Sequence, residues 1–215
     1  MTELTLIIGN KNYSSWSLRP WLAMKQAGID FTEIRIALDT PTTYQEIRRY
    51  SPAGKVPVLL HNQLTVWDSL AICEYVAECA PSLWPQDRIA RAVARSVSAE
   101  MHSGFINLRQ NMPMDCRSRQ CVIGINPALQ ADIDRITSIW HECRQQFGAG
   151  GDFLFGQFSI ADAMFAPAVS RFITYGVQLD SVAQAYATAI CELPAMQAWV
   201  EAAICEIESI PNFQF

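Results

Sequence analysis

The N-terminal part of the chain alternates between short apolar runs and stretches with helical spacing. Residues 4–8 form an apolar, β-branched run that predicts a strand, and residues 31–36 alternate apolar and polar positions as a half-buried strand does. Between them, apolar side chains recur at the spacing of a helix: Leu18, Trp21, Leu22 and Ile29. Gly28 lies where such a helix is C-capped. Strand, helix and strand in this order predict a βαβ unit with parallel strands and a right-handed crossover.

The pattern continues with a short helix and a hairpin. Residues 43–50 have helical character, and two apolar runs follow at 56–60 and 64–67, joined by a short polar turn. Asp68 and Ser69 then precede another helical run, which indicates a helix with an acid or hydroxyl cap. The N-terminal part is therefore predicted to be an α/β unit.

From residue 81 onward the pattern becomes helical, which places a linker at 80–86. One long helix is predicted over 87–110, with an apolar face made by Val97, Met101, Phe105, Leu108 and Met112. Further helices are predicted over 127–147, 159–174, 180–191 and 194–207. Ser159 and Asp162 have the spacing of a capping box, and the apolar tail 212–215 is expected to pack against the body of the protein.

The candidate chemistry lies in residues 12–20, which turn the first strand into the first helix. Ser14 and Ser15 stand at the N-terminus of that helix, where unpaired backbone N–H groups and the helix dipole favour an anion such as a thiolate. Serine is also a preferred N-cap residue, so a purely structural role is an alternative.

Charge excludes some functions. Half of the 215 residues are hydrophobic, 17% are charged, and the net charge is −5, so there is no general basic field for nucleic acid. Arg88, Arg91 and Arg95 share one predicted helix face, but three arginines make only a short stripe, which favours a solvated or interface face.

Terminus and cysteine usage predict a soluble cytoplasmic protein. The N-terminus has no basic region before a long apolar segment, and no run approaches the roughly eighteen apolar residues of a membrane span. The seven cysteines are an odd number without CxxC spacing, which is typical of reduced thiols. The three histidines lie far apart, so no metal is expected, and the lack of a long apolar run means that no membrane partner is expected either.

Three motifs carry a resemblance to a known family: Ser14–Arg19 (Ser-Ser-Trp-Ser-Leu-Arg), Ser51–Leu59 (Ser-Pro-Ala-Gly-Lys-Val-Pro-Val-Leu) and Asp68–Ile72 (Asp-Ser-Leu-Ala-Ile). In this order they resemble the thioredoxin-like half of the cytosolic glutathione transferases, nearest the zeta class, which includes maleylacetoacetate isomerases. The Ser159–Asp162 box resembles the one in that family's helical domain. The resemblance implies an α/β thioredoxin-like glutathione-binding domain over 1–81 and an all-α helical-bundle domain over 87–215.

The resemblance also implies where glutathione, the co-substrate, binds. Val56 before Pro57 pairs with the tripeptide main chain, and Pro57 stands at the head of a strand-like run where a cis peptide is allowed. Asp68 and Ser69 receive the γ-glutamyl group, and Lys55 meets the glycyl carboxylate. As alternatives, Asp68 is only an N-cap and Lys55 only a solvated charge.

In the zeta register Ser14 aligns with the residue that activates the thiol, and Ser15 assists. The family has cysteine at the next position where this chain has Trp16, so the choice between Ser14 and Ser15 stays open. The arginine that zeta isomerases use for the substrate's carboxylate is replaced by Thr174, with Arg171 one turn earlier. This difference weakens the isomerase assignment more than the transferase assignment.

The electrophile is expected between the two domains, near Tyr13, Trp16, Met101 and Phe105. The leading hypothesis is thus a homodimeric glutathione-dependent transferase or isomerase that acts on a small hydrophobic electrophile. A non-catalytic, protein-binding module with the same fold is the alternative. Thiol–disulfide exchange ranks last, since no cysteine precedes residue 73.

Overall fold

The computed structural model describes residues 4–119 and 124–210. Its strands are β1 (Leu4–Ile8), β2 (Thr32–Arg35), β3 (Val58–His61) and β4 (Leu64–Trp67). The helices among and after these strands are α1 (Ser15–Gln26), α2 (Thr43–Arg48), α3 (Ser69–Cys79) and the 3₁₀ turn η1 (Pro81–Leu83). The later helices are α4 (Arg88–Ser103), α5 (Ile106–Asn111), α6 (Pro127–Phe147), α7 (Ile160–Tyr175), α8 (Ser181–Glu192) and α9 (Pro194–Ile204).

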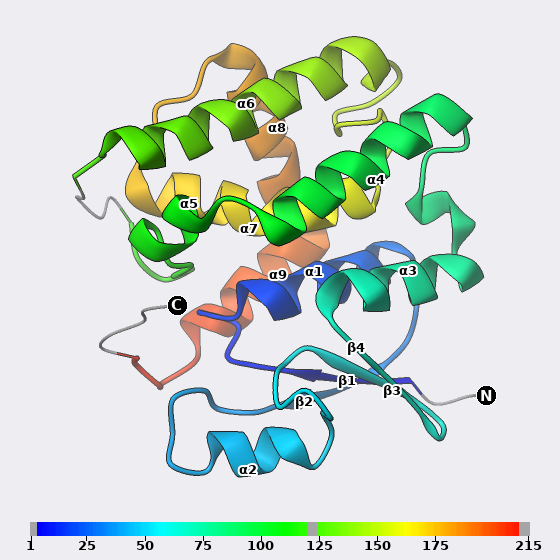
Figure 1. The fold of residues 1–215 in the computed structure, drawn as a ribbon, viewed down its shortest axis with the longest axis vertical. Coiled ribbons are helices and arrows are strands. Elements are labelled where there is room, and N and C mark those ends of the chain that lie inside the picture. The colour runs from blue at the N-terminus through cyan, green and yellow to red at the C-terminus, as the bar shows by residue number, and fades with distance from the viewer. Residues whose placement is uncertain (1–3, 120–123, 211–215) are drawn as a thin grey trace.

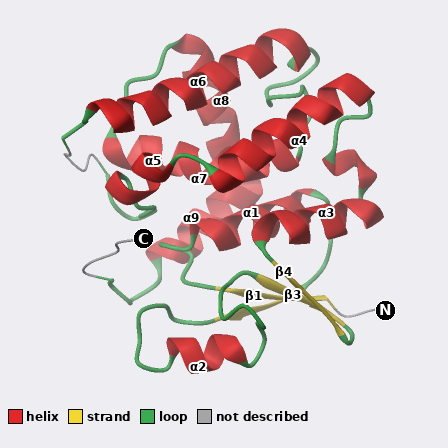
Figure 2. Cartoon of the chain, viewed as in Figure 1, coloured by secondary structure: helices red, strands yellow, loops and turns green. Residues whose placement is uncertain are grey.

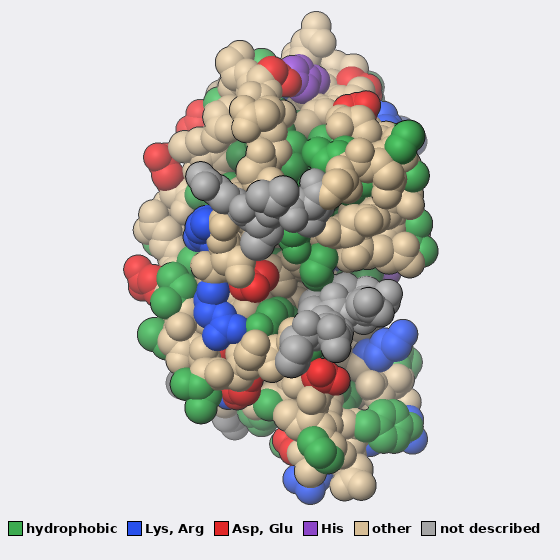
Figure 3. All heavy atoms as spheres, turned by 90° about the vertical axis from the view of Figure 1, so that its left-hand side faces the viewer, with side chains coloured by type: hydrophobic (Ala, Val, Ile, Leu, Met, Phe, Trp, Pro, Cys, Tyr) green, Lys and Arg blue, Asp and Glu red, His purple; other side chains and the backbone are tan. Residues whose placement is uncertain are grey.

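The molecule has a sheet at one end and a helical bundle at the other. Helices α1 and α3 lie between the sheet and the bundle, and α2 covers the outer face of the sheet (Figure 1). Figure 2 shows the strands confined to this single layer. On the face shown in Figure 3, acidic and basic side chains are interspersed. This agrees with the net charge of −5, which predicts no general basic surface.

The sheet has the strand order β2-β1-β3-β4. Strand β1 pairs parallel with β2 and antiparallel with β3, and β3 pairs antiparallel with β4, so the predicted βαβ unit and hairpin are confirmed. Leu6 and Ile8 belong to the main core, whereas Ile7 packs in a smaller cluster with Ile47 of α2. The alternation of β1 side chains thus fills a core on each face of the sheet.

Helix α7 is the centre of the bundle and is buried on almost every side. Its start is fixed by the predicted capping box: the Ser159 N–H donates to Asp162 Oδ2 at 2.8 Å, and the Ser159 side chain accepts from the backbone of Asp162. Asp162 Oδ1 also accepts from the Leu154 N–H at 3.0 Å. Burial raises the pKa of Asp162 to about 6 despite these bonds.

The single helix predicted over 87–110 is wrong. Helix α4 ends at Ser103, Phe105 takes a left-handed conformation with φ 61°, and α5 begins at Ile106. The new start is held from outside the segment, because Asp132 of α6 accepts from the Leu108 N–H at 2.9 Å. Arg109 also bonds across the break, since its guanidinium donates to the carbonyls of Gly104 and Met101. The apolar spacing is therefore helical on both sides of a break that side chains of α5 and α6 hold.

The sheet part and the helical part share one core. Trp21 of α1 and Trp199 of α9 meet edge to face with their ring centroids 5.1 Å apart, and Trp199 Nε1 donates to the Lys11 carbonyl at 2.9 Å. The passage from α3 through η1 to α4 coincides with the predicted linker, and the division into domains 1–81 and 87–215 stays a prediction. The expected packing of the tail 212–215 lies outside the described residues. Across the described ranges, no helix combines the length and hydropathy that a membrane crossing needs.

Candidate active site

A cavity of about 270 Å³ lies where the start of α1, the turn before β3, the junction of β4 with α3, and α4 come together. We call it the interdomain cavity, and its lining residues are Trp16, Ala53, Lys55, Val56, Pro57, Trp67, Asp68, Ser69 and His102. Residues from three separate sequence motifs thus line one cavity, and α4 closes it from the helical side.

The turn before β3 contributes main-chain atoms to this cavity. The Val56–Pro57 peptide is cis, a geometry that the position of Pro57 allows. Ser51 holds the turn, because its Oγ accepts from the Lys55 N–H at 3.2 Å. Lys55 itself lines the cavity, so the lining contains a positive side chain as well as the N-terminus of α3.

Asp68 is both the N-cap of α3 and part of the cavity wall. Its Oδ1 accepts from the N–H groups of Leu70 at 2.9 Å and Ala71 at 3.2 Å, so Asp68 does make the hydrogen bonds of an N-cap. The backbone φ of Asp68 is +75°, and its side chain is 44% exposed. Its other oxygen, Oδ2, lies 3.1 Å from His102 Nε2. Beside it, Ser69 Oγ is buried without a partner in the described part of the chain.

Ser14 and Ser15 lie at the start of α1 and are both buried. Ser14 holds the N-cap position but makes no capping bond; its Oγ donates instead to Ser17 Oγ at 2.7 Å. Ser15 Oγ accepts from Arg171 Nη2 of α7 at 3.1 Å. Neither serine lines the interdomain cavity, whereas the adjacent Trp16 does. The hydroxyls therefore have partners other than the helix N-terminus.

Three guanidinium groups, two buried and one half-buried, surround this helix start. The Trp16 ring packs between Arg19 and Arg109, whose Cζ atoms lie 4.3 Å and 4.7 Å from its centroid, and Arg171 holds Ser15. Within the described residues none of the three forms an ion pair. Burial and mutual repulsion lower the pKa of Arg19, and the same causes lower the pKa of Arg171 to about 9. Because a guanidinium keeps its proton in proteins, the three groups make a positive region that favours an anion.

Three other predicted residues lie outside the cavity lining. Tyr13 is buried, and its hydroxyl accepts from Arg117 Nη2 at 2.7 Å and from the Ile210 N–H at 3.3 Å. Met101 and Phe105 are buried in the main core. The structure thus places Tyr13 against the C-terminal segment, and it uses Met101 and Phe105 for packing.

His102 is the titratable cavity residue that sequence reasoning missed. It lies seven residues after Arg95, and Arg95 pairs with Glu74 of α3 at 3.3 Å. Extending the arginine stripe of α4 by two helical turns therefore reaches His102 on the face that meets α3. The spacing of His102 from Arg95 could be read from the sequence, but only the packing of α4 on α3 shows that this face lies at the cavity.

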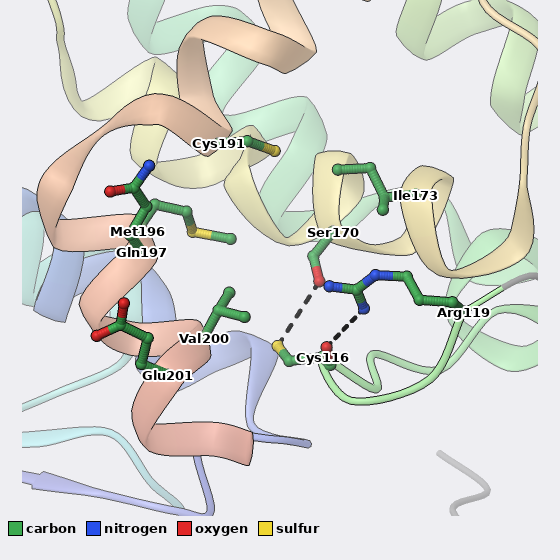
Figure 4. A pocket seen from close by; sticks show the side chains of 9 residues that line it. All are labelled: Cys116, Arg119, Ser170, Ile173, Cys191, Met196, Gln197, Val200 and Glu201. Carbon is green, nitrogen blue, oxygen red and sulfur yellow. Dashed lines mark hydrogen bonds between the residues drawn. The ribbon is translucent and has the colours of Figure 1, made fainter. Parts of the chain in front are cut away.

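A second cavity, of about 310 Å³, lies wholly within the helical part (Figure 4). We call it the C-terminal cavity; it is lined by Cys116, Arg119, Ser170, Ile173, Cys191, Met196, Gln197, Val200 and Glu201. Burial raises the pKa of Cys116 and of Cys191 to about 11 each. Neither thiol is thus prepared for thiolate chemistry.

The chain is similar in sequence to known maleylacetoacetate isomerases. Maleylacetoacetate isomerase from Rattus norvegicus is 29% identical over 171 residues, which cover 77% of this chain and 76% of that protein. A probable maleylacetoacetate isomerase from Caenorhabditis elegans is 34% identical over 93 residues, 42% of each chain. The first is similar along most of its length and the second over less than half.

Solved structures share the fold. A glutathione transferase homolog from Burkholderia GL BGR1 with bound glutathione has a TM-score of 0.71 at 24% identity and covers 94% of this chain and 98% of its own. The theta class glutathione S-transferase from Xanthomonas axonopodis pv. citri, also with glutathione bound, has a TM-score of 0.68 at 22% identity, covering 95% and 100%. The predicted fold class, a thioredoxin-like domain followed by a helical bundle, is confirmed.

Family models assign both parts of the chain. The model for the glutathione S-transferase N-terminal domain matches residues 13–79, and the model for the C-terminal domain of the same family matches residues 126–202. The first match contains the start of α1, the cis-proline turn and the Asp68–Ser69 pair, and the second contains the capping box of α7. The chain therefore belongs to the glutathione S-transferase family and is an enzyme of the transferase or isomerase type.

Proposed function

We propose that the chain binds glutathione in the interdomain cavity and transfers its sulfur to a small hydrophobic electrophile, or uses the sulfur to isomerise one. One observation carries this proposal: Lys55, the Val56–Pro57 turn and the Asp68–Ser69 pair, predicted from separate motifs, line the same cavity. A tripeptide with an ammonium group and two carboxylates requires this combination of main-chain and charged groups.

Each part of glutathione has a partner of matching chemistry there. The Asp68 carboxylate pairs with the γ-glutamyl ammonium, while Ser69 and the N-terminus of α3 receive the α-carboxylate. The unpartnered, buried Ser69 Oγ supports this assignment. Val56 pairs with the extended main chain, and Lys55 receives the glycyl carboxylate across the cavity.

The thiol is activated at the start of α1. Ser14 or Ser15 donates a hydrogen bond to the sulfur, and the helix dipole together with Arg19, Arg109 and Arg171 favours the thiolate over the thiol. The proton leaves to solvent. The thiolate then attacks the electrophilic carbon; with a halonitrobenzene a C–S bond forms, the C–halogen bond breaks, and the halide leaves with the electron pair.

Retention on immobilised glutathione, followed by turnover of a halonitrobenzene, tests the proposal. We expect both retention and a rate of C–S bond formation above that of glutathione alone. Retention without turnover would favour the non-catalytic, protein-binding module, and failure of both would exclude glutathione as the co-substrate.

The proposal includes a homodimer in the cytoplasm, which the family resemblance implies. Light scattering at micromolar protein measures the first part directly. We expect a mass of twice the 24.1 kDa of one chain, and a value of 24.1 kDa would contradict the dimer.

A further inference from the structure

We propose that His102 of α4 is a positioning residue for glutathione: it donates through Nε2 to Asp68 Oδ2 and aims this oxygen, which does not cap α3, at the γ-glutamyl ammonium. The inference rests on the proposed function and adds to it a residue from the helical part of the chain.

The two oxygens of Asp68 have different tasks. Oδ1 is held by the N–H groups of Leu70 and Ala71, so only Oδ2 is left for a ligand, and Oδ2 lies 3.1 Å from His102 Nε2. The positive φ of Asp68 is unusual for a residue other than glycine, so the backbone conformation alone does not favour this placement. A contact from α4 can therefore stabilise the orientation of the Asp68 carboxylate, which the backbone does not fix.

The ring of His102 is itself held in place. Trp16 meets it edge to face with ring centroids 5.4 Å apart, and both side chains line the interdomain cavity together with Asp68. The His102 side chain is 26% exposed, while its Nδ1 is buried and has no partner in the described part of the chain. Since Nδ1 has no acceptor, the tautomer with the proton on Nε2 is favoured, and that tautomer donates to Asp68.

The surrounding charges keep the ring neutral. The charged groups that face His102 are Arg19 from α1, Arg109 from α5 and Asp68 at the start of α3. Burial and the two guanidiniums lower the pKa of His102, and Asp68 opposes them without reversing the shift. A neutral histidine orients Asp68 but leaves its negative charge for the ammonium, whereas a lysine or arginine at this position would compete for that charge.

This arrangement predicts a pH dependence of binding. Protonation of His102 places a cation against Asp68, where it competes with the ammonium of glutathione. Bound glutathione in turn disfavours the protonated ring, so affinity is full well above the pKa of His102 and decreases as the pH falls through it, below about 6.5. Neither the ammonium nor the carboxylates of glutathione titrate in this window.

The chain contains a matched control. His141 of α6 pairs with Asp180 at 2.7 Å, and Asp180 is the N-cap of α8 just as Asp68 is the N-cap of α3. The control pair is exposed and lines neither of the two cavities described above. Substitutions of His141 therefore measure the general effect of a histidine on a capping aspartate, without glutathione.

The experiment is calorimetric titration of the full chain with glutathione, from pH 5 to pH 7.5, alongside steady-state kinetics. His102→Leu removes the donor, and we expect about a tenfold weaker affinity at pH 7.5 and a higher KM for glutathione with little change in kcat. His102→Gln keeps a donor that does not titrate, so we expect affinity near that of the wild type at pH 7.5 and a flatter pH profile below it. His141→Leu and His141→Gln are expected to bind as the wild type does.

Each outcome decides between explanations. Wild-type affinity in folded His102→Leu, or an unchanged pH profile in His102→Gln, would overturn the positioning role while leaving the proposed function intact. A wild-type chain that neither binds nor turns over glutathione would overturn the proposed function, and the role of His102 with it. An equal loss in the His141 variants would show a general effect and would also overturn the inference.

Discussion

The two cavities described above are similar in size but differ in the segments that line them and in the charged groups near them. The interdomain cavity, of about 270 Å³, is lined by segments from both parts of the chain and brings together Lys55, Asp68 and His102. The C-terminal cavity, of about 310 Å³, is lined by residues of the helical part alone. Charged groups from distant segments, Arg119 and Glu201, line the larger of these two cavities as well, so neither its volume nor the presence of charge by itself locates a reaction.

Electrostatics explains the difference further. The interdomain cavity lies beside the N-termini of α1 and α3 and near three guanidiniums that form no ion pair within the described residues, and these groups stabilise anions. The lining of the C-terminal cavity contains a single guanidinium, that of Arg119, which donates to the carbonyls of Cys116 at 2.7 Å and Ser118 at 2.8 Å, and it also contains the carboxylate of Glu201. Cys116 and Cys191 lie in surroundings that keep them protonated. The interdomain cavity thus favours the thiolate form of a bound ligand, whereas the C-terminal cavity keeps its own two cysteines in the thiol form.

Removing the hydroxyl of Ser14 should have the largest effect at the interdomain site. We expect Ser14→Ala to lower kcat by about 100-fold and to raise the pKa of bound glutathione, with little change in affinity, because a lost donor to the thiolate costs on the order of 3 kcal/mol. Ser14 makes no capping bond, so the loss of stability should be limited to that of one buried hydrogen bond, the one to Ser17 Oγ, which costs about 1 kcal/mol. Thiolate absorbance titrated against pH measures the effect.

Ser15→Ala is the matched control for this experiment. Arg171 donates to Ser15, so this substitution leaves a buried guanidinium with one partner fewer but should affect the thiol less. A raised thiol pKa only in Ser15→Ala would transfer the role to Ser15. If neither variant changes the pKa or the rate, the start of α1 does not activate the sulfur, and the comparison of the two cavities fails.

Asp68→Asn should have the next largest effect. Asparagine still caps α3 but lacks the charge that pairs with the γ-glutamyl ammonium, so we expect glutathione affinity to decrease by about 10- to 100-fold with nearly unchanged thermal stability. Asp180→Asn, which changes the corresponding cap of α8, should leave affinity unchanged. Calorimetric titration and thermal unfolding of both variants measure this, and equal affinities would mean that Asp68 is a cap and nothing more.

Much of the fold was predictable because its signals are local. The apolar run of β1, the capping box of Ser159 and Asp162, and the helical spacing over 127–147 each depend on residues near one another, and each is confirmed. The break after Ser103 was missed: Gly104 is a local stop signal, but the restart at α5 is capped by Asp132, which reaches the Leu108 N–H from another helix. Apolar periodicity reports which face is buried and does not report which neighbour interrupts the helix.

The candidate site divides in the same way. Lys55, Pro57 and Asp68 stand at the ends of predicted elements, and the structure brings them together. Tyr13 was expected at the electrophile, but Arg117, more than a hundred residues later, donates to its hydroxyl. His102 escaped notice because its meaning depends on how α4 lies against α3. Contacts between elements distant in sequence therefore decide the surroundings of both residues, and the role of Tyr13 at the electrophile stays a prediction.

The smallest effect is expected at the C-terminal cavity. With a pKa of about 11, only about one Cys191 or Cys116 thiol in ten thousand is ionised at pH 7, so alkylation of the folded protein should leave both unmodified. Cys79 and Cys205 are exposed and serve as internal controls that should react first. Mass spectrometry after iodoacetamide treatment identifies the modified residues, and turnover with glutathione should change less than twofold. Preferential labelling of Cys191 accompanied by loss of turnover would show that the C-terminal cavity takes part in the reaction and would reverse the distinction between the two cavities.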